Sequence, residues 1–166
     1  MDKEIQLVPM VIKGLIMDQN SQTPIVILQD QNRSRFLPIW IGAAEANAIV
    51  LEIEGVRPPR PLTHDLIVNV LTTLDAQVTQ IVVTDLRDGT FFAAIHLRTA
   101  AGDVEVDSRP SDAMALALRV DAPILVAEPV LEEASQDQRT ERLRYDEVMK
   151  KYLEDIDDED LGDYEM

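Results

Sequence analysis

The chain has 166 residues, no cysteine and a formal net charge of −16 at pH 7. This length suffices for one compact domain with a buried core plus an appendage. The lack of cysteine excludes disulfides, thiolate zinc sites and cysteine nucleophiles. The N-terminal apolar run begins with acidic residues and is interrupted by Lys13, which fits neither a signal peptide nor a membrane span. We therefore expect a soluble, cytoplasmic protein with no membrane partner.

The negative charge is concentrated toward the C-terminal end. Residues 1–131 carry 17 acidic and 10 basic side chains, a balance of −7, whereas residues 132–166 carry 14 and 5, a balance of −9. We expect a domain over 1–131, a charged helical extension over 132–154 and an acidic disordered tail over 155–166. A nucleic-acid surface on the domain is weakened by this balance without being excluded, and it would have to be local or metal-assisted.

Seven segments have the composition of β-strands, because they are rich in β-branched and apolar residues and are bounded by turn residues. Pro38 places the third of them at a sheet edge or a bulge, and Gly14 indicates a bulge or a close approach in the first. The turn at 87–90, which contains Gly89, predicts a β-hairpin. The predicted strands cover residues 5–17, 24–29, 34–41, 78–86, 91–98, 104–108 and 124–127.

Two helices are predicted between the third and fourth strands. The first covers 43–54, with Gly55 as a plausible C-cap, and the second runs over 64–76 after Thr63 as N-cap. A rigid, proline-rich connector separates them. The spacing i, i+3, i+4, i+7 places the buried stripe of the second helix at Ile67, Val70, Leu71 and Leu74.

A third helix begins at Pro110, where a proline loses no intrahelical hydrogen bond. Residues 113–118 have no polar face, so we expect this helix to be covered on most sides. A dense polar cluster stands directly before and within its first turn: Asp107, Ser108, Arg109, Ser111 and Asp112. Helix capping explains such a cluster on its own, and chemistry at the junction is the alternative.

The strand-to-helix junction at 40–51 has the same order of features as the junction at 106–118. In each, a strand passes through a small or polar turn into an alanine-rich helix with an acidic residue in its first turn. An internal strand–helix duplication and the ordinary way in which a strand enters a helix explain this similarity equally well. After the last strand, Pro129 starts a charged C-terminal helix.

Several side chains have the chemistry of a catalytic or binding site. His64 stands at a predicted helix start, and imidazole serves near neutrality as a general acid, a general base or a metal ligand. Arg57, Arg60 and Arg109 suit phosphate, since guanidinium binds it bidentately and a stiff loop lowers the ordering cost. They could equally pair with carboxylates in a structural network. Four carboxylates could converge on a divalent cation: Glu45, Asp65, Asp107 and Asp112.

The sequence lacks the common catalytic and nucleotide-binding motifs. It has no GxxxxGK[ST] or GxGxxG phosphate loop, no GxSxG elbow, no HExxH helix and no zinc-finger spacing. It also has only one Trp, three Phe and three Tyr, too few for an aromatic face that stacks bases.

Three motifs carry a resemblance to a known family. LPIWIGAAEANAI at 37–49, RPLTHDL at 60–66 and VDSRPSDAMALALR at 106–119 resemble the bifunctional nuclease (BFN) domain family of bacteria and plants, whose members are described as cleaving DNA and RNA. The resemblance covers roughly residues 5–131. It implies an α+β fold, in which three helices pack on a mixed or largely antiparallel sheet of about seven strands with the C-terminal helix added. It also implies a homo-oligomer.

The resemblance implies a nuclease of low sequence specificity, assisted by Mg²⁺ or Mn²⁺ and acting on DNA and RNA. The residues that fall in its motifs then receive roles as physical hypotheses. The predicted catalytic residues are His64, Asp65, Asp107 and Asp112; the substrate-binding ones are Arg60, Arg109 and Ser111; the metal ligands are Asp107, Asp112 and Glu45. The alternative is a non-enzymatic binding or regulatory module, whose polar motifs bind a small anion or form a subunit interface.

Overall fold

The computed structural model of the protein describes residues 3–137. The chain divides after Leu131 into two units, and the sheet and the site described below lie in the first, Met1–Leu131. The extension predicted over 132–154 is therefore described only as far as residue 137. The acidic tail predicted over 155–166 lies outside the described residues.

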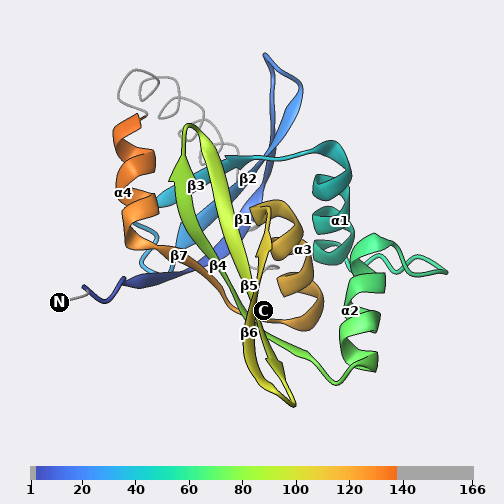
Figure 1. Ribbon diagram of the computed structural model, residues 1–166. Helices are drawn as coiled ribbons and strands as arrows, with labels where there is room; N and C mark the ends of the chain where they lie inside the picture. The colour runs from blue at the N-terminus through green and yellow to red at the C-terminus, as the bar shows by residue number, and fades with distance from the viewer. Residues whose placement is uncertain (1–2, 138–166) are drawn as a thin grey trace. The chain divides into compact units, whose positions relative to one another are not determined.

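The first unit is built on one seven-stranded sheet with the order β3-β2-β1-β7-β4-β5-β6 (Figure 1). All neighbouring strands are antiparallel except β7 and β4, which are parallel. The predicted α+β fold with a mixed, largely antiparallel sheet is confirmed. The strands are β1 Leu7–Asp18, β2 Thr23–Asp30, β3 Phe36–Trp40, β4 Gln77–Arg87, β5 Thr90–Thr99, β6 Gly102–Ser108 and β7 Ile124–Ala127.

The local predictions from Pro, Gly and turn residues are confirmed. Pro38 lies in β3, an edge strand that pairs only with β2, so its missing N–H disrupts no second ladder. The register of β1 on β2 shifts between Ile12 and Gly14, which is the predicted irregularity. Asp88 and Gly89 both have positive φ, at 50° and 76°, as a tight hairpin between β4 and β5 requires.

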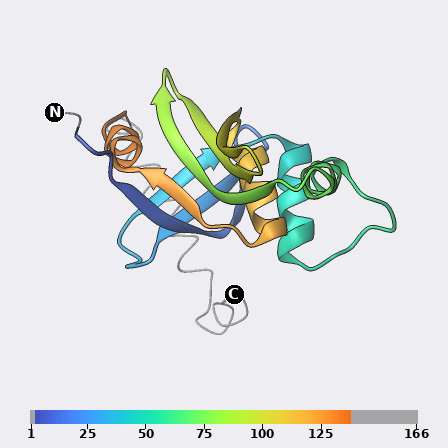
Figure 2. The ribbon, with the colours of Figure 1, turned by 60° about the horizontal axis from the view of Figure 1, so that its bottom comes forward.

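Four helices complete the described chain: α1 Ala43–Ile53, α2 Thr63–Thr73, α3 Pro110–Val120 and α4 Glu128–Asp137. The central one is α3, which contacts β4, β5, α1 and α2. Both ribbon views show α3 nearest the strands, with α1 and α2 farther out (Figures 1 and 2). Residues 113–117 of α3 are each at most 2% exposed, which confirms the prediction of a helix covered on most sides.

The predicted buried stripe of α2 is wrong. Ile67, Val70 and Leu74 are 37%, 47% and 70% exposed, and the only buried residue of the helix is His64. The reason is the direction of packing: α2 touches α3 through its first turn, so the side that carries His64 faces inward. The N-cap is also Leu62 rather than Thr63, because the Asp65 carboxylate accepts the Leu62 backbone N–H at 2.9 Å.

The order of elements repeats within the sheet. A three-stranded meander followed by a helix occurs as β1-β2-β3-α1 and again as β4-β5-β6-α3, and β3 and β6 form the two opposite edges. The two helices that follow these edges, α1 and α3, pack against each other. The predicted similarity of the two junctions therefore extends to whole strand–helix units. None of the helices described here is long and apolar enough to cross a membrane.

Candidate active site

Four side chains form a continuous polar network where three helices begin. His64 Nε2 lies 2.8 Å from Asp112 Oδ1, and Arg109 Nε donates to Asp112 Oδ2 at 2.9 Å. Arg109 Nη2 also donates to Glu45 Oε1 at 2.6 Å. The chain of contacts therefore runs from His64 through Asp112 and Arg109 to Glu45. We call these four residues the junction network.

The fold brings these residues together because each stands at a helix start. Glu45 and Asp112 occupy the third positions of α1 and α3, His64 the second position of α2, and Arg109 is the N-cap of α3. Glu45 and Asp112 are also the acidic residues that the two similar junctions share. The packing of α1 on α3 thus places two corresponding carboxylates on one guanidinium.

Gly42 gives Glu45 the room that this arrangement needs. A Cβ atom at Gly42 would lie 2.1 Å from Glu45 Oε2, so any larger residue would push the carboxylate away. Glycine at the N-cap of α1 therefore lets the Glu45 side chain fold back over the helix start, where it meets Arg109.

In the junction network one guanidinium contacts two carboxylates. The hydrogen bond from Arg109 is the largest influence that holds the pKa of Glu45 below its ordinary value. The hydrogen bonds to Glu45 and then Asp112 raise the pKa of Arg109, which therefore stays charged at every working pH. The Arg109 side chain is nevertheless 63% exposed, so one side of a fixed positive charge faces solvent.

Asp65 belongs to a second cluster, although it is the neighbour of His64. Its Oδ1 accepts Arg119 Nε at 2.7 Å, and its Oδ2 accepts the Leu62 backbone N–H. Arg119 is 6% exposed and also donates from Nη1 to the carbonyl oxygens of Ala48 and Ala115. This arginine therefore joins α1, α2 and α3 from inside the helix layer.

Arg119 was not among the candidate site residues predicted from the sequence. It ends an apolar helix as that helix's one basic residue, and a charged side chain there must find a partner if it is buried. That pattern indicates a buried arginine that needs a charged partner. The partner, Asp65 on α2, could be identified only from the packing of the helices.

The acid stability of the protein is expected to depend on Asp65. The Leu62 N–H and then Arg119 hold the pKa of Asp65 below its ordinary value. A lowered native-state pKa adds stability above the unfolded-state value of about 3.9, and this contribution is lost as the pH falls through the native-state pKa. Urea midpoints measured from pH 6 to pH 3 should therefore fall less steeply below about pH 4 in Asp65→Asn than in the wild type. Parallel curves would contradict this assignment.

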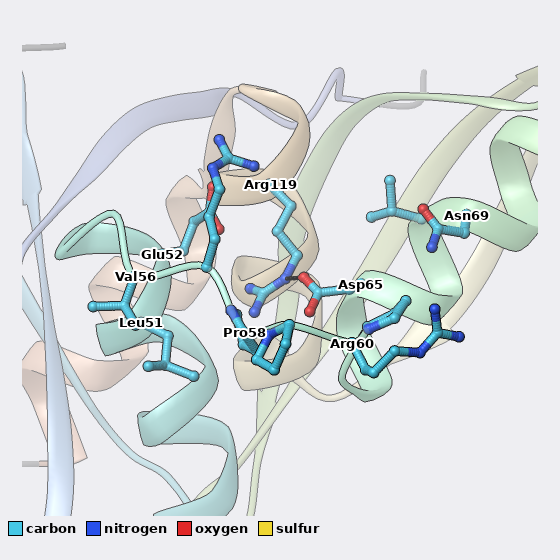
Figure 3. Close-up of a pocket in the computed structure, with 12 residues that line it drawn as sticks. Leu51, Glu52, Val56, Pro58, Arg60, Asp65, Asn69 and Arg119 are labelled. Carbon is cyan, nitrogen blue, oxygen red and sulfur yellow. Dashed lines mark hydrogen bonds and ion pairs between the residues drawn. The ribbon is translucent and has the colours of Figure 1, made fainter.

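A pocket of about 360 Å³ lies beside the second cluster. It is lined by the end of α1, the proline-rich connector, α2 and Arg119, and Asp65 and Arg60 are among its side chains (Figure 3). The structure thus places Arg60 in this pocket, whereas no contact joins it to the junction network within the described residues.

The remaining predicted site residues lie apart from the junction network. Asp107 is exposed on the edge strand β6, and Ser111 is 5% exposed in the first turn of α3, where a ligand could reach it only by displacing packed neighbours. Of the eight predicted residues, the structure brings together four: Glu45, His64, Arg109 and Asp112.

The described residues do not fit the predicted ligand set for a divalent cation. Among residues 3–137, no group of three or more His, Asp or Glu side chains is placed to hold a metal ion. The two carboxylates that do meet, Glu45 and Asp112, face the Arg109 guanidinium, which already supplies the positive charge between them. A cation at this position would compete with Arg109.

Comparison with known proteins assigns the family. The sequence profile of the bifunctional nuclease domain matches residues 26–139, a segment that contains the whole junction network. The chain belongs to the bifunctional nuclease domain family, as its motifs indicated. Two Mycobacterium tuberculosis proteins are similar to it, the uncharacterized protein MT1877 of strain CDC 1551 and the uncharacterized protein Rv1829 of strain H37Rv. Each is 40% identical over 159 residues, covering 90% of this chain and 95% of the relative.

Proposed function

We propose that the protein is a nuclease that hydrolyses phosphodiester bonds in DNA and RNA at the junction network. The observation that carries the proposal is the contact of His64 with Asp112, whose other oxygen is bound by an exposed arginine, Arg109. A histidine oriented by a carboxylate is a common general acid or base, and an adjacent arginine is a common phosphate ligand. Family membership supports the same reaction.

The network suggests a role for each of its members. Asp112 fixes the His64 ring through Nε2, which leaves Nδ1 as the nitrogen that can take a proton from an attacking water. Arg109 binds the phosphate and stabilises the charge that grows on its oxygens. Glu45 is a positioning residue, because its carboxylate binds the same Arg109 nitrogen, Nη2, that contacts Asp112.

The helix starts favour an anion at this place. The N-terminal ends of α1, α2 and α3 meet around the junction network, and the N-terminal end of a helix carries a partial positive charge. This local field supports the approach of a phosphate despite the net charge of −16. No side chain of the network reaches a base edge in this scheme, so we expect low sequence specificity.

The proposal is tested with purified protein on labelled single-stranded and duplex DNA and on RNA. Each substrate is incubated with Mg²⁺, with Mn²⁺ and with a chelator, since the requirement for a divalent cation stays a prediction. We expect cleavage of DNA and RNA that co-elutes with the protein and is absent from an inactive variant prepared identically. No cleavage of any substrate under any of these conditions would refute the nuclease proposal.

A non-enzymatic module is the second candidate, and one observation favours it. Both carboxylates of the junction network are bound by Arg109, and His64 is buried, so these contacts could also serve only to hold the three helices together. In that case Arg109→Gln lowers the thermal midpoint, while no metal-dependent cleavage is seen with any substrate. The homo-oligomer and the cytoplasmic location expected from the sequence stay predictions, the first of which light scattering can check.

A further inference from the structure

The pocket beside Arg119 is separate from the junction network and has its own chemistry. Its walls come from the last turn of α1, the connector that follows it and one side of α2. His64 and Asp112 do not line it, and Asp65 contributes to it through a carboxylate already bound by Arg119 (Figure 3). A volume of about 360 Å³ lies within the range of sites for small molecules.

The charge available to a ligand in this pocket is positive. Asp65 and Arg119 neutralise each other, which leaves Arg57 and Arg60 against the single carboxylate of Glu52. Among the residues that the structure describes, neither Arg57 nor Arg60 takes part in a hydrogen bond or an ion pair. Two guanidinium groups without such partners that line the same pocket are suited to an anion that accepts several hydrogen bonds.

Most of the remaining lining is apolar, and part of it is stiff. Leu51 and Val56 present hydrocarbon to the pocket, and Pro58, Pro59 and Pro61 line it from the connector. Because each proline fixes its own φ, the segment that carries both arginines loses little conformational entropy when it binds a ligand. The pocket therefore combines an anion-binding part with a small apolar part on a preorganised loop.

We infer that this pocket binds a small phosphate monoester, with the phosphate on Arg57 and Arg60 and the organic group against Leu51 and Val56. A phosphate monoester carries up to two negative charges and three exposed oxygens, so it satisfies two arginines better than a carboxylate does. The site is independent of the proposed cleavage reaction, and its occupancy is measured without turnover.

The test is isothermal titration calorimetry of the full chain with a nucleoside 5′-monophosphate, with ribose 5-phosphate and with inorganic phosphate. We expect saturable binding of the esters and weaker binding of inorganic phosphate. The double variant Arg57→Gln/Arg60→Gln should weaken ester binding about tenfold or more, because it removes charge-assisted hydrogen bonds. Glu52→Gln should tighten binding, since it removes the opposing charge.

Two control variants locate the site. Arg98→Gln, which changes an exposed arginine on β5 outside the pocket, should leave the affinity unchanged. Loss of the measured affinity in Arg109→Gln would place the ester at the junction network rather than in the pocket, and it would overturn the inference. Absence of saturable binding, or wild-type affinity in the Arg57/Arg60 double variant, overturns the inference. Equal affinity for inorganic phosphate and the esters overturns the assignment of the apolar wall to an organic group.

Discussion

Replacing His64 by alanine is expected to lower the rate of phosphodiester cleavage by about a hundredfold to ten-thousandfold, the usual contribution of a positioned general acid or base. The proposed reaction has no second imidazole in the junction network that could take over this proton transfer. Asp112→Asn should lower the cleavage rate by a similar factor. It removes the carboxylate charge that faces His64 Nε2 and weakens the ion pair with Arg109. Single-turnover rates on one DNA and one RNA substrate measure both effects.

The matched control is His96→Ala, which removes the other histidine of the chain. His96 lies on β5, where its Nδ1 is 3.5 Å from an exposed carboxylate, Glu105, and it has no contact with the junction network. Its loss should leave cleavage of both substrates unchanged. If His64→Ala keeps full activity while it remains folded, the reaction takes place elsewhere on the protein or belongs to a contaminant.

The strands could be predicted from the sequence because their determinants are local. Alternating or continuous apolar runs are bounded by residues such as Gly89 and Pro123, whose backbone preferences act over two or three positions. The missing N–H of Pro38 alone restricts this residue to an edge or a bulge, and the sheet order shows that it lies in an edge strand.

The orientation of α2 could not be predicted in the same way. Its apolar residues outnumber the positions that face α3, and the periodicity of the sequence does not say which of them the fold leaves exposed. The helix is instead oriented by two polar contacts of its first turn, from His64 to Asp112 and from Asp65 to Arg119. These contacts join residues 48 and 54 positions apart, so only the assembled fold specifies them.

The sequence predicted which residues belong to the candidate site, but it did not predict which of them contact one another. Residues at helix starts were identified from capping patterns, and half of the eight meet in the junction network. Asp107 was included because it falls in the motif at 106–119, yet it lies on the strand side of the junction and is exposed there. The residue types allowed the arginines either to bind phosphate or to pair with carboxylates in a structural network. The contacts of Arg109 with Glu45 and Asp112 form such a network.

Removing the Asp65 carboxylate is expected to cost about 3 kcal/mol of unfolding free energy in Asp65→Ala. The change leaves the Arg119 guanidinium, 6% exposed, without a counter-charge inside the helix layer, and it also removes the acceptor of the Leu62 N–H. The measurement is the urea midpoint at pH 7, with the slope of the transition compared to confirm a two-state process. Asp85→Ala breaks the exposed Asp85–Arg87 pair and should cost much less, so it is the matched control.

The double variant Asp65→Leu/Arg119→Met shows why Asp65→Ala is unstable. It distinguishes the cost of an unpaired buried guanidinium from the loss of the contact between α2 and α3. If the cost of Asp65→Ala arises from the uncompensated guanidinium, replacing both partners with apolar side chains should recover most of the stability. The carbonyl oxygens of Ala48 and Ala115 lie within helices and keep their backbone hydrogen bonds when Arg119 is removed. A double variant as unstable as Asp65→Ala would instead show that the pair is required for the packing of α2. In that case His64 is also displaced, and cleavage at the junction network depends on the Asp65–Arg119 pair.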